Sequence, residues 1–247
     1  MRDALSFKRH RLGDRPRRAA PLALQVGAAA LPGLAAIGAA PVLTGGTAAG
    51  IAGAVLVFAL VCAAVVLAMR DTYPHARIGG CNGVTLLRLA MASALLVPLN
   101  AGLSGGWAVA GIAAVALMLD GVDGLLARRS GLQSRFGARF DIEADAAMAL
   151  VLALHVLAQR GLVAEVLVLG LIRYAFVLAQ GLWPWLGGDL PPRRWRKWVC
   201  VLQLATLIAL QAPVVGPDAG AALARLAAAA LVASFAVDIR RLWRHRP

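Results

Sequence analysis

The amino-acid sequence predicts an all-α fold, a polytopic bundle of membrane-spanning helices. Three observations support this prediction: the composition, the length of the apolar runs and the distribution of charge. Of the 247 residues, 60% are hydrophobic, and the mean hydropathy is +0.75. Soluble domains contain about 45–50% apolar residues by a broader count that includes Gly. The excess is too large for a soluble core and indicates helices surrounded by lipid.

Eight apolar runs are each long enough to cross a bilayer, which takes about 20 residues in a helix. Many of them are rich in Ala and Gly, and small residues allow helix backbones to approach one another closely. The runs lie near 20–42, 47–69, 83–103, 105–127, 138–159, 162–183, 197–214 and 219–239.

The basic residues predict the orientation in the membrane. The net charge is +13, and 21 of the 25 lysines and arginines lie in segments on one side of the eight runs, whereas the opposite connections hold only Arg160. Because basic connections stay in the cytoplasm, we expect both termini and the 128–139 connection there, in an inner (cytoplasmic) membrane. Residues 1–19 form a basic cytoplasmic segment in this prediction. The short basic clusters form no continuous basic face, which argues against nucleic-acid binding.

Acidic residues are concentrated in one part of the chain, where five of the twelve fall between positions 120 and 145. Asp120 and Asp123 are three residues apart, and Asp141 and Asp145 are four apart, so each pair shares one helical face. A short connection joins the two helices, which we therefore expect to be antiparallel neighbours. Their four carboxylates can then converge at one depth, near the cytoplasmic ends of the helices.

Four converging carboxylates repel one another strongly unless cations neutralise them. Oxygen-only ligands suit hard ions such as Mg²⁺ or Mn²⁺ rather than zinc. The sequence therefore predicts a divalent-metal site. Glu143 lies about 200° around the helix from Asp141, and we expect it to point elsewhere, toward Arg139. A transporter is the alternative for acids within membrane helices, but it would place them near the midplane.

Three residues close to the aspartates in the sequence each have two interpretations. Gly124 and Gly137 can serve helix packing, or they can let a phosphate or base approach the backbone. Arg128 can be a topology charge, or it can bind a diphosphate.

At this point the sequence resembles the CDP-alcohol phosphotransferase family. The family signature of eight fixed residues over 26 positions is matched throughout by Asp120-Gly-Val-Asp123-Gly124-Leu-Leu-Ala127-Arg128, eight residues, Gly137, three residues, Asp141, three residues and Asp145. Upstream, Asn82-Gly-Val-Thr85-Leu-Leu-Arg88 resembles the opening of the family's first core helix, although Cys81 stands where Pro is frequent. The resemblance covers about 82–240 and implies a six-helix catalytic core, preceded by two extra transmembrane helices in 20–70.

The resemblance also implies roles for individual residues. Two Mg²⁺ or Mn²⁺ ions would be bound by the first three aspartates, and Asp145 would complete the metal site and deprotonate the acceptor hydroxyl. The acceptor would attack the β-phosphorus of a CDP-linked substrate, and CMP would leave. Family members are often homodimers, so a homodimer is possible here. The residues expected to bind the CDP-linked substrate are Asn82, Thr85, Gly124, Ala127, Arg128 and Gly137.

We therefore expect an integral membrane enzyme of phospholipid biosynthesis. It would transfer a substituted phosphate group, the phosphatidyl group of CDP-diacylglycerol, to an alcohol acceptor. Transfer from CDP-choline or CDP-ethanolamine to diacylglycerol uses the same chemistry and stays open, whereas the complete signature argues against a catalytically inactive assembly protein. Arg139 and Arg173 are candidates for holding an anionic acceptor, although Arg173, inside a span, can instead be the partner of an internal carboxylate. On its apolar helix, His155 is expected to be a packed core residue.

Overall fold

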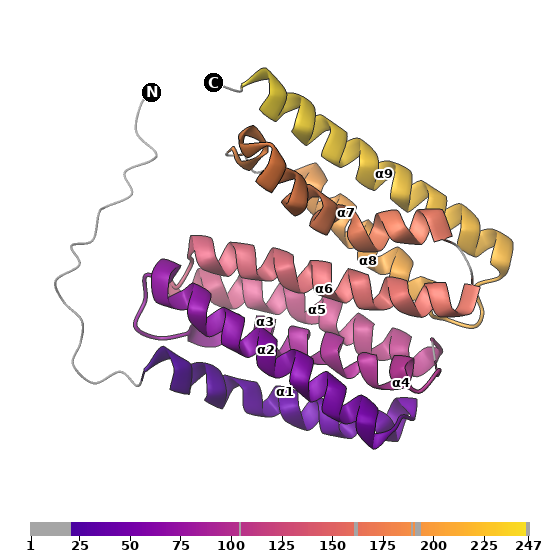
Figure 1. Ribbon diagram of the computed structural model, residues 1–247, viewed down its shortest axis with the longest axis horizontal. Coiled ribbons are helices and arrows are strands. Elements are labelled where there is room, and N and C mark those ends of the chain that lie inside the picture. The colour runs from indigo at the N-terminus through magenta and orange to yellow at the C-terminus, as the bar shows by residue number, and fades with distance from the viewer. Residues whose placement is uncertain (1–20, 104, 161–162, 189, 191–193, 246–247) are drawn as a thin grey trace.

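The computed structural model describes residues 21–103, 105–160, 163–188, 190 and 194–245 (Figure 1). The predicted basic segment 1–19 lies outside the described residues. Every regular element in the described part is helical, which confirms the predicted all-α fold. These described residues form eight long helices, one short helix and a 3₁₀ turn: α1 (Leu22–Thr44), α2 (Ala48–Thr72), α3 (Gly79–Ala94), α4 (Leu96–Asn100), α5 (Trp107–Ser130), α6 (Arg135–Arg160), α7 (Val163–Leu182), η1 (Pro184–Gly187), α8 (Arg194–Ala209) and α9 (Pro217–Arg244).

The predicted span at 83–103 is interrupted, because α3 ends at Ala94 and α4 continues after Leu95. Pro98 explains the interruption. It has no backbone N–H to donate to the carbonyl of Ala94, and its ring clashes with that carbonyl. Next to the break, His155 Nε2 lies 2.9 Å from the carbonyl oxygen of Leu95. His155 is fully buried, in agreement with its expected place in the core.

Among the described residues, five helical segments are long and apolar enough to cross a membrane, compared with the eight spans predicted: α1, α2, α3 with α4, α7 and α9. Their length and composition make the protein an integral membrane protein with several spans. The hydrophobic outer surfaces agree with this conclusion, because large apolar side chains on α1 and α2, such as Leu24 and Leu60, are more than half exposed. Such exposure would be unfavourable in water and is normal in lipid.

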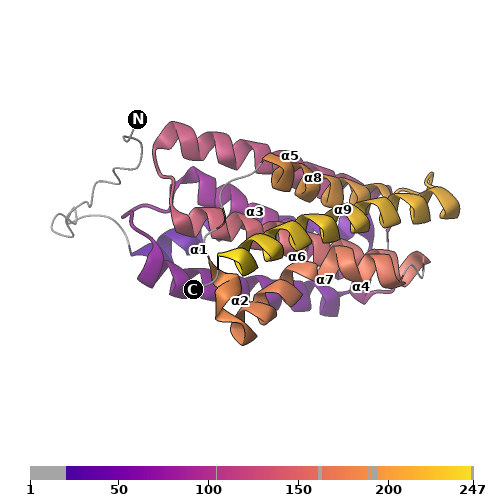
Figure 2. The ribbon, with the colours of Figure 1, turned by 90° about the horizontal axis from the view of Figure 1, so that it is seen from above.

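Helix α3 lies at the centre of the bundle, where it packs against α1, α5 and α6. Figure 1 shows the α1–α2 pair on one side of it and α7 and α9 beyond α6, and Figure 2 shows α8 beside α5, which it contacts. Small residues allow the close approach of α1 to α3, since a Cβ added at Gly33 would lie only 2.6 Å from the Cβ of Ala90. The central helix α3 therefore contacts both α5 and α6, the two helices that carry the acidic residues 120–145.

Candidate active site

Helices α5 and α6 bring three of the four predicted aspartates together. Asp120 on α5 and Asp141 and Asp145 on α6 each offer a carboxylate oxygen, and these atoms all lie within 4.8 Å of one another. The backbone of Asp123 belongs to α5, but its side chain lies outside the described residues. The structure therefore contains a carboxylate cluster built from two helices, as the spacing indicated.

The packing around this cluster differs in one respect from the expectation that α5 and α6 are direct neighbours. The connection between them is short, from Gly131 to Ser134, but α5 packs mainly against α3, and α6 packs against α7 and α3. The expected direct packing of α5 on α6 is therefore wrong, whereas the expected convergence is seen for Asp120, Asp141 and Asp145. The carboxylates meet because α3 holds the two helices at the same level, and a short connection by itself does not require close packing along two helices.

Arg88 on α3 is the cation of the cluster, and sequence reasoning did not count it as a site residue. Its Nη1 lies 3.1 Å from Asp120 and 2.5 Å from Asp141, and its Nη2 contacts Asp145. The Arg88 side chain is only 4% exposed, whereas those of Asp120, Asp141 and Asp145 are 16%, 37% and 25% exposed. A lone arginine within an apolar span was the signal that could have identified it, because such a charge requires a partner.

The charge balance of the cluster suits a divalent cation. Three carboxylates and one guanidinium leave two net negative charges among the described side chains. All the ligand atoms are oxygen, which hard ions such as Mg²⁺ and Mn²⁺ prefer. The aspartates are partly exposed, so an ion could reach them. The residues present therefore fit a divalent-metal site.

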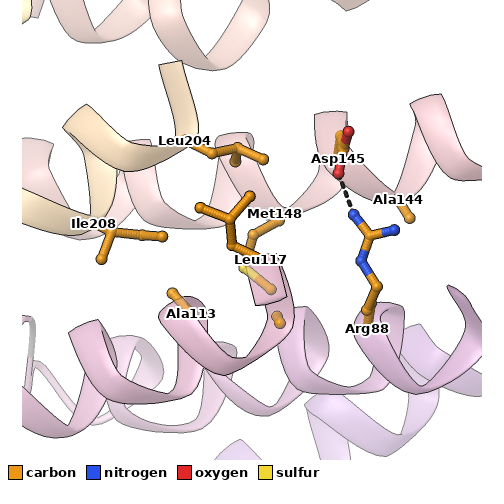
Figure 3. Close-up of a pocket in the computed structure, with 9 residues that line it drawn as sticks. Arg88, Ala113, Leu117, Ala144, Asp145, Met148, Leu204 and Ile208 are labelled. Carbon is orange, nitrogen blue, oxygen red and sulfur yellow. Dashed lines mark hydrogen bonds and ion pairs between the residues drawn. The ribbon is translucent and has the colours of Figure 1, made fainter. Parts of the chain in front are cut away.

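The cluster lies at a boundary between polar and apolar surroundings. Figure 3 shows Arg88 reaching from α3 toward Asp145 on α6, with Met148, Leu117 and Leu204 beside them. These residues line one small pocket. An apolar wall of this kind lowers the local dielectric constant and strengthens the interactions of the charged groups.

Asn82, Thr85 and Arg88 follow one another at intervals of three residues along α3, and all three are buried. Asn82 donates from Nδ2 to the carbonyl of Ile78 at 2.7 Å, and Thr85 donates to the carbonyl of Cys81 at 3.1 Å. A Cβ added at Gly137 of α6 would come within 3.3 Å of Asn82 Oδ1. One face of α3 therefore links the aspartate cluster with the start of α6.

The remaining signature residues lie on α5. Gly124 is half-buried there. Ala127 and Arg128 belong to the same helix, but their side chains lie outside the described residues.

Glu143 forms an ion pair with Arg173 of α7. The expectation that Glu143 points toward Arg139 is therefore wrong, and Arg139 is exposed. The physical reason is tertiary, since α7 packs against α6 on the face that carries Glu143. Of the two interpretations of Arg173, the structure therefore shows the one in which this arginine pairs with a carboxylate of the bundle, that of Glu143.

Residues 80–238 match the family model described as CDP-alcohol phosphatidyltransferase. The chain belongs to this family. The resemblance seen in the sequence is thereby confirmed over most of the predicted core. Searches of curated proteins and of solved structures gave no match.

Membership of the CDP-alcohol phosphatidyltransferase family makes this protein a transferase that acts on CDP-alcohols in a membrane. The family is generally metal-dependent, in keeping with the cluster of Asp120, Asp141 and Asp145. Those three carboxylates and Arg88 are thus the central groups of a candidate transferase site.

A second cavity, of about 190 Å³, begins at Asp145 and extends between α6, α7, α8 and α9. Its walls are mainly apolar and include Phe176 and Phe235. Its cationic groups are Arg173 and Arg196, its acidic groups are Asp145 and Asp238, and Arg196 pairs with Asp238 at 3.0 Å. The cavity therefore shares Asp145 with the aspartate cluster.

Proposed function

We propose that the protein transfers the phosphatidyl group of CDP-diacylglycerol to an alcohol, with release of CMP, in phospholipid biosynthesis. The observation that carries the proposal is the convergence of Asp120, Asp141 and Asp145 around the buried Arg88 in a chain of this family. A diphosphate substrate needs positive charge to neutralise it, and the converging carboxylates are suited to bind the cations that supply this charge at one point.

Two Mg²⁺ or Mn²⁺ ions would be held by Asp120, Asp123, Asp141 and Asp145. When bound, these ions neutralise the diphosphate and stabilise the charge on the departing CMP. Arg88 holds one oxygen of each described aspartate and so limits the rotation of their side chains. The protein thereby presents its carboxylates in a fixed arrangement before any substrate arrives.

The CDP part of the substrate would lie along α3 and the start of α6. Asn82 and Gly137 face each other there, and the missing side chain at Gly137 leaves room beside Asn82 Oδ1. Thr85 extends this surface toward Arg88 along the same helix face. We propose Asn82, Thr85 and Gly137, together with Gly124, Ala127 and Arg128 of α5, as the residues that bind the CDP-linked substrate.

Asp145 is suited to be the general base because it borders both parts of the site. It belongs to the aspartate cluster and also lines the cavity between α6 and α9. Its carboxylate would take the proton from the acceptor hydroxyl. The hydroxyl oxygen would then bond to the β-phosphorus, the bond between that phosphorus and CMP would break, and CMP would leave with the electron pair.

The acceptor alcohol would occupy the cavity beside Asp145. Arg173 and Arg196 supply its cationic groups, and Arg139, near the N-terminal end of α6, is a further candidate for binding an anionic acceptor. The mainly apolar wall also suits a lipid acceptor, so transfer from CDP-choline or CDP-ethanolamine to diacylglycerol is the second candidate. The two candidates differ in which substrate carries the acyl chains.

We further propose that both termini and the active site face the cytoplasm from an inner membrane, because the basic residues lie at that end of the helices. In this proposal, 82–240 forms the catalytic core, 20–70 the extra helix pair and 1–19 a basic cytoplasmic segment. A homodimer is compatible with this arrangement.

The test is an assay of CMP release and lipid products from the purified protein with Mn²⁺. One arm contains CDP-diacylglycerol with a panel of labelled alcohols, and another contains CDP-choline or CDP-ethanolamine with diacylglycerol. We expect CMP and a labelled phospholipid in the first arm, and neither with Asp141→Asn. Products in the second arm alone would support the second candidate, and an absence of CMP in every arm would refute the proposed activity.

A further inference from the structure

The N-terminal helix pair α1–α2 precedes the region of the family match, yet it is bonded to the start of the core. Gln25 in α1 donates from Nε2 to the carbonyl of Ala76 at 3.0 Å and accepts at Oε1 from the N–H of Ile78 at 3.0 Å. One carboxamide thus satisfies two backbone groups that are two residues apart. This contact holds the segment 76–78, just before α3, in a single position relative to α1.

Tyr73, at the end of α2, binds the same segment from the other side. Its hydroxyl lies 2.9 Å from the carbonyl of Ile78 and 2.8 Å from that of Arg77. The hydroxyl also accepts a hydrogen bond from Asn82 Nδ2 at 3.1 Å. Burial raises the pKa of Tyr73 to about 12, so the phenol stays protonated and remains a donor at physiological pH.

These contacts determine how the Asn82 side chain is oriented. Its Nδ2 donates to the carbonyl of Ile78 at 2.7 Å and to the hydroxyl of Tyr73, so both amide hydrogens are used. The amide oxygen must then point the other way, toward Gly137. The Tyr73 ring also packs edge-on against Phe136, with 5.6 Å between the ring centroids. The end of α2 therefore contacts both sides of the gap between Asn82 and Gly137.

We propose that Gln25 and Tyr73 are positioning residues, through which the N-terminal helix pair orients Asn82 toward the CDP-linked substrate. This inference rests on the proposed function, in which Asn82 and Gly137 contact that substrate. It assigns a role to helices that the catalytic chemistry does not use. The effect passes through the segment 76–78 and Asn82, and Asp145 takes no part in it.

The experiment measures the dissociation constant of CDP in the presence of Mn²⁺, together with KM for CDP-diacylglycerol and kcat. Tyr73→Phe removes the hydroxyl that bonds to Asn82, and Gln25→Leu removes the two hydrogen bonds that hold the segment 76–78. We expect each to raise the CDP dissociation constant and KM by about 2- to 10-fold, the usual effect of one such bond. We expect kcat to stay within about twofold of the unmodified protein, because the reacting groups are unchanged.

Gln180→Leu is the matched control. This glutamine on α7 also donates from Nε2 to a backbone carbonyl, that of Leu186 at 3.2 Å, but far from Asn82. It should leave CDP binding unchanged. Tyr73→Phe nearly preserves shape, so it keeps the test valid if Gln25→Leu fails to fold.

A double-mutant cycle separates positioning from general support of the fold. In an Asn82→Ala background, Tyr73→Phe should cause no further loss of CDP affinity, because the oriented group is already gone. Fully additive losses, unchanged CDP affinity in both folded variants, or an equal loss in Gln180→Leu would overturn the inference while leaving the proposed function intact. If the unmodified protein neither binds CDP with Mn²⁺ nor releases CMP, the proposed function fails and the inference fails with it.

Discussion

Arg88 provides the most direct test of how the aspartate cluster is stabilised. The perturbation is Arg88→Met, which keeps most of the length of the side chain and removes its charge. Arg88 is almost fully buried and contacts three carboxylates. Removing it changes the net charge of the described cluster from −2 to −3 and leaves three carboxylates close together without their cation.

Breaking a buried ion pair by removing one partner costs about 3–5 kcal/mol. The carboxylates here are 16–37% exposed, and solvent weakens their repulsion, so we expect the lower end, about 3 kcal/mol, in EDTA. For a chain of this size, each kcal/mol shifts the unfolding midpoint by about 2–4 °C. The midpoint of Arg88→Met should therefore fall by about 6–12 °C when metal is absent.

Mn²⁺ should reverse much of this loss, because a cation bound by the aspartates replaces the missing positive charge. The assay is thermal unfolding in detergent, in EDTA and in excess Mn²⁺. Arg225→Met is the control, because its partner Glu165 lies 3.3 Å away in a pair where Arg225 is 69% exposed, and such pairs contribute at most about 1 kcal/mol. An unchanged midpoint in EDTA, or an equal loss with and without Mn²⁺, would refute this account of the cluster.

Three further predictions follow from the site. Asp145→Asn should lower turnover by about 10²–10⁴-fold and keep most of the CDP affinity, as expected for a general base. Asp141→Asn should weaken Mn²⁺-dependent CDP binding as well as turnover. CDP titration and CMP release distinguish the two variants, and equal losses of CDP binding would make Asp145 chiefly a metal ligand. Excess EDTA should abolish CMP release, and added Mn²⁺ or Mg²⁺ should restore it; full activity in EDTA would exclude a metal role. In a variant without the native cysteines, a Cys placed at Gln133 should react with an impermeant thiol reagent only after the cells are opened, and labelling of intact cells would reverse the proposed orientation.

Several features of the fold and the site could be predicted from sequence because they depend on local spacing. The lengths of the apolar runs predicted the long helices, and the break at Leu95 is the main departure inside a run. The intervals between Asp120 and Asp123 and between Asp141 and Asp145 placed each pair on one helical face. The same residues carried the family resemblance, which the match over 80–238 confirms.

Other features depend on which helix faces which, and local spacing does not contain that information. Glu143 has Arg139 one turn away, but its partner in the structure is Arg173, 30 residues further along the chain. The pair forms because α7 packs against α6 and brings Arg173 within reach of Glu143. The position of α3 against both α5 and α6 could not be read from the short connection either.

By itself, then, the sequence determined the helical class, the residues of the signature and their rotation about their own helices, because these follow from the period of 3.6 residues per turn. Only the tertiary structure decided that Arg88 lies among the three carboxylates, 53 and 57 residues from Asp141 and Asp145, and that Gln25 reaches Ile78 from 53 residues away. Contacts at such separations depend on how the side chains of several helices pack together at once. No single stretch of sequence specifies that packing.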